Sequence, residues 1–152
     1  MANTQAMCTS FKQDLLNGLH AFGTSVVRAG TTADTFKAAL YLTTANIGAA
    51  TTAYSATNEV SGTGYTAGGV AVTFGTAPTT SGTTAYVTPS ASIVYTTVTL
   101  STAFDSVLLY NNTASGKNAV SVHTFGAQTI TAGTLTLTMP TNAAGTALLQ
   151  IS

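Results

Sequence analysis

The chain has 152 residues, of which 45% are hydrophobic and only 5% are charged, and its formal net charge is zero. So few Lys and Arg side chains can neutralise few phosphates or anionic headgroups, which argues against nucleic-acid binding and against charge-driven membrane binding. The length suits one domain with a sizeable core, and the hydrophobic content is too high for a disordered chain. A neutral surface also lacks the self-repulsion that keeps copies apart, as expected of a protein packed against neighbours.

The sequence contains one cysteine, Cys8, so an intrachain disulfide is excluded. Its first residues do not show a basic segment followed by an apolar run, and no apolar run approaches the ~18 residues of a membrane span. We therefore expect neither a signal peptide nor a transmembrane helix, and we expect synthesis and assembly in a cytoplasm.

The N-terminal part predicts an arm followed by one helix. Residues 1–9 are polar and lack periodicity, which is typical of an extended arm. Ser10 and Gln13 fit a capping box, so the helix should begin at Ser10, and Gly23 should end it. Apolar side chains recur at helical spacing, which predicts a stripe that packs on a sheet or a partner. The stripe consists of Phe11, Leu15, Leu16, Leu19 and Phe22.

The rest of the chain has the pattern of short strands. Most of these segments are rich in β-branched residues or alternate between apolar residues and threonine, both of which favour half-buried strands. The predicted strands are Thr35–Leu42, Val70–Phe74, Ile93–Leu100, Ser106–Tyr110, Ala119–Phe125, Thr134–Met139 and Ala147–Ile151.

Turn-forming residues separate these strands. Asn111–Asn118 predicts a hairpin loop, and Gly126–Gln128 and Ala132–Gly133 predict tighter turns. The segments Thr43–Thr57 and Thr76–Pro89 are long, small and polar, as expected of loops that bind something. The pattern predicts a mainly β fold, in which residues 10–152 form a single-domain β-sandwich or jelly roll with one short N-terminal helix.

Residues that could carry chemistry are scarce. Two His, one Cys and four carboxylates are the whole inventory, and none of them has metal-ligand spacing. The chain lacks a G-x-S-x-G nucleophile motif. Residues 62–67 match a relaxed G-x-G-x-x-A pattern, but Gly68 and Gly69 interrupt the helix that a dinucleotide site needs. We therefore expect no enzyme, no cofactor and no metal.

Contacts with other proteins are the more promising use of this surface. Tyr54 and Tyr65 fall in predicted loops, and tyrosine is favoured at interfaces. Met7 in the arm and Phe11 on the helix complete our set of predicted assembly contacts, whereas Cys8 is expected to be a small buried apolar residue. The chain has no Trp, which argues against a carbohydrate-binding module.

Three segments resemble small virion structural proteins of tailed bacteriophages. They are MANTQAMCTSFKQDLLNGLHAF at the start, FKAALYLTTANIGAATTAYSATNEVSGTGYTAGG from Phe36 to Gly69, and LLYNNTASGKNAVSVHTFG from Leu108 to Gly126. The resemblance spans nearly the whole chain, and the segment from Phe36 to Gly69 is its most specific part. Because no catalytic motif belongs to this resemblance, it implies no catalytic residue.

The likeness to small jelly-roll cement proteins implies a capsid decoration protein. Such a protein would bind the major capsid protein on the outer face of the assembled head as a dimer or trimer, and its location would be the virion. Deleting residues 1–9 would then reduce head occupancy without unfolding the domain. A tail, baseplate or fibre component is the alternative, and a carbohydrate-binding module is a more distant one.

Overall fold

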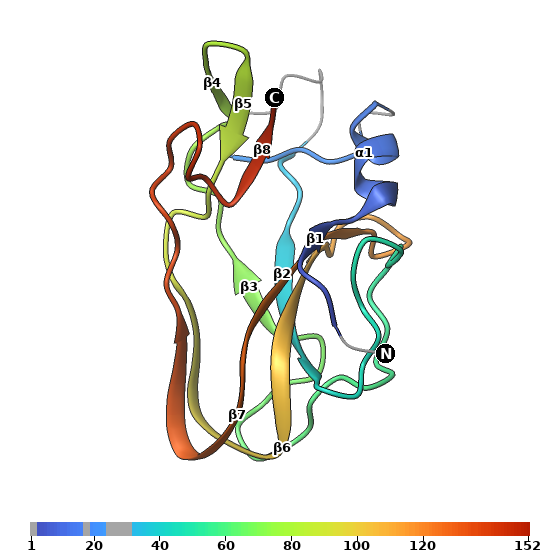
Figure 1. Cartoon of the computed structure of the whole chain (residues 1–152), viewed down its shortest axis with the longest axis vertical. Coiled ribbons are helices and arrows are strands. Elements are labelled where there is room, and N and C mark those ends of the chain that lie inside the picture. The colour runs from blue at the N-terminus through green and yellow to red at the C-terminus, as the bar shows by residue number, and fades with distance from the viewer. Residues whose placement is uncertain (1–2, 17–18, 24–31) are drawn as a thin grey trace.

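The computed structural model describes residues 3–16, 19–23 and 32–152. It contains one short helix and is otherwise built of strands and loops (Figure 1). The elements are β1 (Ala6–Met7), α1 (Thr9–Leu16), β2 (Phe36–Leu42), β3 (Val70–Val72), β4 (Thr79–Ser81), β5 (Thr84–Val87), β6 (Ile93–Asn111), β7 (Ala119–Leu137) and β8 (Leu149–Ile151).

The strands form two sheets in which every pairing is antiparallel. Five strands lie in the order β1-β7-β6-β2-β3, and three lie in the order β4-β5-β8. This arrangement confirms the predicted mainly β sandwich with one short N-terminal helix.

The two longest strands, β6 and β7, belong to the five-stranded sheet. This sheet bends, so that each of the two strands has one half in each layer of the sandwich. Figure 1 shows both strands turning at the bottom of the molecule and continuing up the other side. Their register shifts repeatedly between Tyr95 and Ser106, and such β-bulges let a paired strand bend. Thr97 and Ala132 have positive φ angles of 50° and 47° within this bent region. The Tyr95 hydroxyl, on the first half of β6, donates to the Ala38 carbonyl of β2 at 2.8 Å and ties the layers together.

The bend corrects the predicted strand boundaries. Segments predicted as separate strands, Ile93–Leu100 and Ser106–Tyr110, are two halves of β6. Likewise β7 runs through Gly126–Gln128 and Ala132–Gly133, which were predicted as turns. Bulges absorb the change of direction there, so the ladder continues across residues that usually end a strand.

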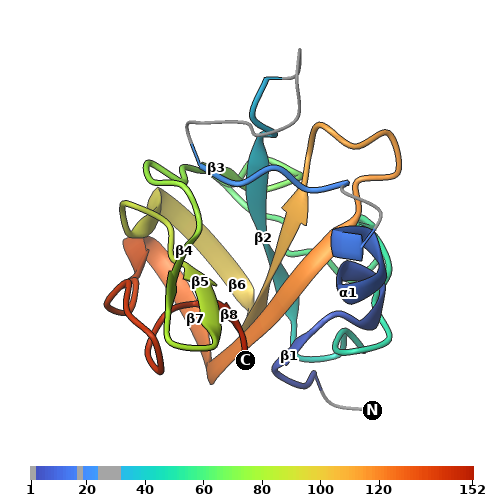
Figure 2. The same ribbon diagram turned by 90° about the horizontal axis from the view of Figure 1, so that it is seen from above.

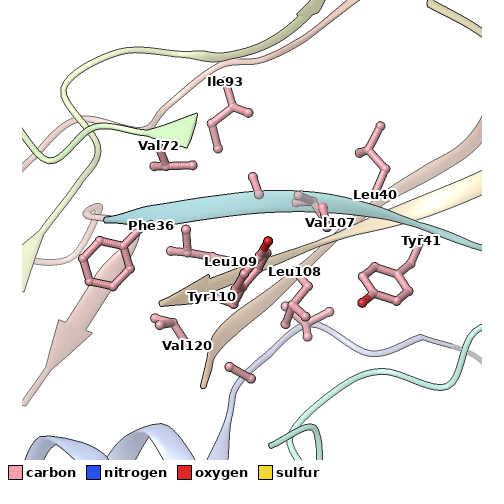
Figure 3. Close-up of a cluster of buried hydrophobic side chains, with 14 of the residues drawn as sticks. Phe36, Leu40, Tyr41, Val72, Ile93, Val107, Leu108, Leu109, Tyr110 and Val120 are labelled. Carbon is pink, nitrogen blue, oxygen red and sulfur yellow. The ribbon is translucent and has the colours of Figure 1, made fainter. Parts of the chain in front are cut away.

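The core lies around β2 and the second half of β6, as Figure 3 shows. Neighbouring residues on β6 point to opposite faces of the sheet, yet both sets are buried. Leu108 and Tyr110 are 0% and 1% exposed, while Val107 and Leu109 are 5% and 2% exposed. The sheet is therefore covered on both faces, which explains why these strands read as continuous apolar runs.

The helix differs from its prediction in length and in capping. α1 begins at Thr9 and ends at Leu16, so Ser10 lies inside it and its hydroxyl donates to the Thr51 carbonyl at 3.4 Å. Phe11 is buried, but Leu19 lies outside the helix and is 36% exposed. The predicted stripe thus continues only partly. Gly23, which was expected to end the helix, lies beyond it in the chain and has a φ angle of 87°.

Another difference concerns the segment Thr76–Pro89, predicted as a long loop. It contains the β4–β5 hairpin, which turns at Gly82 with a φ angle of 58°. β5 then pairs with β8 at the C-terminal end. By contrast, residues 112–118 form the predicted loop between β6 and β7.

Residues 3–9 lie against the domain. β1 pairs with β7 through Ala6 and Met7, and the Cys8 amide donates to the Val120 carbonyl at 3.1 Å. The Asn3 side-chain nitrogen lies 2.6 Å from the Asp105 carboxylate. The predicted arm is therefore an edge of the main sheet in this structure.

These contacts change what we expect from truncation. Deleting residues 1–9 removes β1, the Asn3 hydrogen bonds and the fully buried Cys8 side chain. We expect the free energy of unfolding to fall by about 3 kcal/mol or more, because lost hydrogen bonds and lost packing add. Urea unfolding followed by circular dichroism measures this, and an unchanged midpoint would show that the segment is not part of the stable fold.

Candidate functional site

An apolar groove of about 200 Å³ lies between α1 and the three-stranded sheet. Figure 1 shows the three short strands at the same end of the molecule as α1. The groove brings together two of the predicted contact residues, half-buried Met7 and buried Phe11. The other lining residues are Leu15, Phe22, Pro78, Ala85, Tyr86, Val87, Leu149, Gln150 and Ile151.

An unpaired strand edge borders this groove. Within the described part of the chain, β8 pairs only with β5, so its other side makes no strand pairing. Figure 2 views the molecule from the end at which β4, β5 and β8 lie. Ile151 on this edge is 49% exposed. None of the residues of β4, β5 and β8 carries a charge, whereas proteins commonly protect open edges with charges or proline. The groove and this edge form the candidate site, which we call the β8 surface.

The other two predicted contact residues, Tyr54 and Tyr65, lie elsewhere and point to one carboxylate. The Tyr54 hydroxyl donates to Glu59 Oε2 at 2.6 Å, and the Tyr65 hydroxyl donates to Oε1 at 2.7 Å. The Gly68 amide also donates to Oε1 at 2.7 Å. Three donors thus satisfy this half-buried carboxylate, and each charge-assisted bond is stronger than a neutral one.

Stacked rings connect this cluster to the main sheet. Tyr54 stacks on Tyr110 with ring centroids 4.8 Å apart, and Tyr65 stacks on Tyr95 at 5.9 Å. The Lys117 ammonium lies 5.1 Å from the centre of the Tyr54 ring. Tyr54 and Tyr65 therefore anchor the 43–69 loop to β6, which is an intramolecular role that their positions in the sequence did not indicate.

The environment of these tyrosines keeps them protonated. Burial raises the pKa of Tyr41 to about 12. Burial first, and then the hydrogen bond to Glu59, raise the pKa of Tyr54 and Tyr65. Burial also raises the pKa of Tyr95 and Tyr110.

An alkaline titration follows from these shifts. Because the folded-state pKa of each tyrosine exceeds its unfolded value of about 10, the stabilisation is complete below pH 10 and is lost as the pH rises further. We expect tyrosinate absorbance and loss of circular dichroism to rise together in one cooperative step. Gradual tyrosinate formation in a chain that keeps its β-sheet signal would contradict this.

A further polar cluster holds the chain before β2 against the end of β6. Asn111 is fully buried, and its amide nitrogen donates to Asp34 Oδ2 at 2.8 Å. The same Asp34 oxygen accepts the Ala21 amide at 2.8 Å. Asp34 lies just before β2, and it links three segments of the chain.

The described residues contain no group of three or more His, Cys, Asp or Glu side chains that could hold a metal ion. Burial raises the pKa of the Cys8 thiol to about 11, so it stays protonated and unreactive at neutral pH. Ser121 Oγ lies 2.9 Å from His123 Nε2, but Ser121 is only 2% exposed and substrate could not reach it.

Comparisons of the chain with protein-family models, with curated proteins and with solved structures each find no match. Among the described residues, the single helix α1 is too short to cross a bilayer.

Proposed function

We propose that this protein is a bacteriophage virion structural protein that binds the outer surface of the assembled capsid and stabilises it. The observation that supports this most directly is the β8 surface, where an apolar groove lies beside a strand edge without protecting charges. An open edge of this kind binds extended segments of other chains through main-chain hydrogen bonds. The neutral, charge-poor composition and the resemblance to phage virion proteins agree with an assembly role.

Stabilisation would work by linkage. A protein that binds the assembled shell but not its free subunits shifts the equilibrium toward the shell by mass action. Many copies at symmetry-related positions add their weak contacts through multivalency. In this mechanism the β8 surface contacts the major capsid protein or a second copy of the chain, and no reactive group is needed.

Occupancy of purified heads tests the proposal with a matched pair of variants. Ile151→Lys places a charge on the β8 surface, where the side chain is 49% exposed, and Val94→Lys does the same on β6, where it is 39% exposed. Both variants should fold, because exposed substitutions rarely cost more than about 0.5 kcal/mol. We expect Ile151→Lys to reduce binding to heads that lack the protein about tenfold or more, and Val94→Lys to bind like the parent.

Two results would count against the proposal. Equal occupancy by both variants would remove the β8 surface from the interface. Only a few copies per virion, measured by gel densitometry, would favour the alternative of a tail, baseplate or fibre component.

A further inference from the structure

A second apolar cavity, of about 270 Å³, lies between the two layers of the sandwich. One wall is formed by buried residues of β2 and the second half of β6, namely Ala38, Val107 and Leu109. The facing wall includes Ile93 and Leu137, from the opposite halves of β6 and β7. The bend of the two long strands therefore creates a cavity where the layers separate.

One imidazole, that of His123, lines this otherwise mainly apolar space. Its Nε2 lies 2.9 Å from the hydroxyl of buried Ser121, two residues earlier on the same strand. Among the described residues the ring makes no other hydrogen bond, and Nδ1 is not one of the fully enclosed polar atoms. Because the ring lines the cavity, a ligand there can reach Nδ1. Burial lowers the pKa of His123, which keeps the ring neutral at pH 7.

We propose that this cavity binds an uncharged, mainly apolar small molecule that carries one hydroxyl group, and that His123 Nδ1 is the hydrogen-bond partner of this hydroxyl. None of the lining residues bears a formal charge at neutral pH, so a charged ligand would lose its hydration without a counter-charge. A hydroxyl both donates and accepts, so it matches either neutral tautomer of the ring. Because a cavity of about 150 Å³ can bind benzene, this one has room for a ligand of about ten non-hydrogen atoms.

The arrangement has the composition expected of a small-molecule site. Such sites have apolar walls and a few placed polar groups that fix the ligand's orientation. Ser121 acts as a positioning residue, since its hydrogen bond fixes the imidazole ring. This inference is independent of the capsid proposal, because the cavity shares no lining residue with the β8 surface.

A pair of probes that differ by one hydroxyl tests the inference on the full chain. We would titrate 4-propylphenol and propylbenzene separately and follow the methyl NMR signals of Val107, Leu109 and Leu137. Both probes should shift these signals saturably. The phenol should bind about three- to tenfold more tightly, the gain expected of one net hydrogen bond.

The variant His123→Leu assigns that gain to the imidazole. We expect it to bind propylbenzene as the parent does and to lose the preference for the phenol. Absence of saturable shifts in the parent chain with both probes would overturn the site, whether or not the variant folds. A phenol preference that persists in His123→Leu would overturn the role of His123.

Discussion

Replacing Gly69 with alanine is expected to prevent stable folding, or to lower the free energy of unfolding by more than about 4 kcal/mol. Gly69 is buried and has a φ angle of 72°. A Cβ atom there would overlap the Ala38 carbonyl oxygen and would lie 2.8 Å from the Ala39 Cα atom. These are backbone atoms of the central strand β2, so they cannot rotate away as a side chain can.

Gly145→Ala is the matched control for this substitution. Gly145 also has a positive φ angle, 87°, but a Cβ atom there would meet nothing within 4 Å. It should therefore cost only the left-handed backbone penalty, about 1–2 kcal/mol. Urea unfolding of both variants separates the two effects, and equal losses would show that β2 accommodates the added methyl group.

The second large effect is expected for Glu59→Gln, which should lower the free energy of unfolding by about 2–4 kcal/mol. The carboxylate accepts hydrogen bonds from Tyr54, Tyr65 and the Gly68 amide. Glutamine has nearly the same size, but its amide nitrogen cannot accept a hydrogen bond. At least one donor is then left unsatisfied, and the remaining bonds lose their charge assistance.

Asp105→Asn provides the comparison for Glu59→Gln. Asp105 is also half-buried, but its carboxylate accepts from one side chain, that of Asn3, at 2.6 Å. We expect a loss of about 1 kcal/mol or less. Near-ultraviolet circular dichroism should report loosened tyrosine packing in Glu59→Gln only. If both variants lose the same stability, the cluster around Glu59 does not hold the loop.

Local patterns predicted those parts of the fold that depend on neighbouring residues. The apolar run of β2 and the alternation in Thr134–Leu137 are signals of burial, and both segments are strands. The β4–β5 hairpin was missed because its residues are mostly threonine, serine and alanine, and those of β4 are exposed. Such a strand has no buried face, so its sequence lacks the alternation that marks one.

The candidate site was harder to predict because it depends on contacts between distant segments. Met7 and Phe11 meet β5 and β8 only after both ends of the chain have folded together. Glu59 is the only acidic residue between Phe36 and Gly69, and two tyrosines of the predicted loops lie near it in the sequence. This was the one signal in the sequence that Glu59 could accept hydrogen bonds from them. The sequence alone could not show that the hydroxyls of Tyr54 and Tyr65 both point inward to the Glu59 carboxylate.

The shared strands β6 and β7 have a consequence for how the molecule folds. Their pairing runs from Tyr110 and Ala119, beside the connecting loop, to Ile93 and Leu137 at the far end. Pairs near the loop close a short segment, whereas the far pairs close a long one at greater entropic cost. The pairs near the loop are therefore expected to form before the pairs at the far end of the two strands. In native-state hydrogen exchange, amides around Leu135 should exchange by openings that leave those around Leu108 protected.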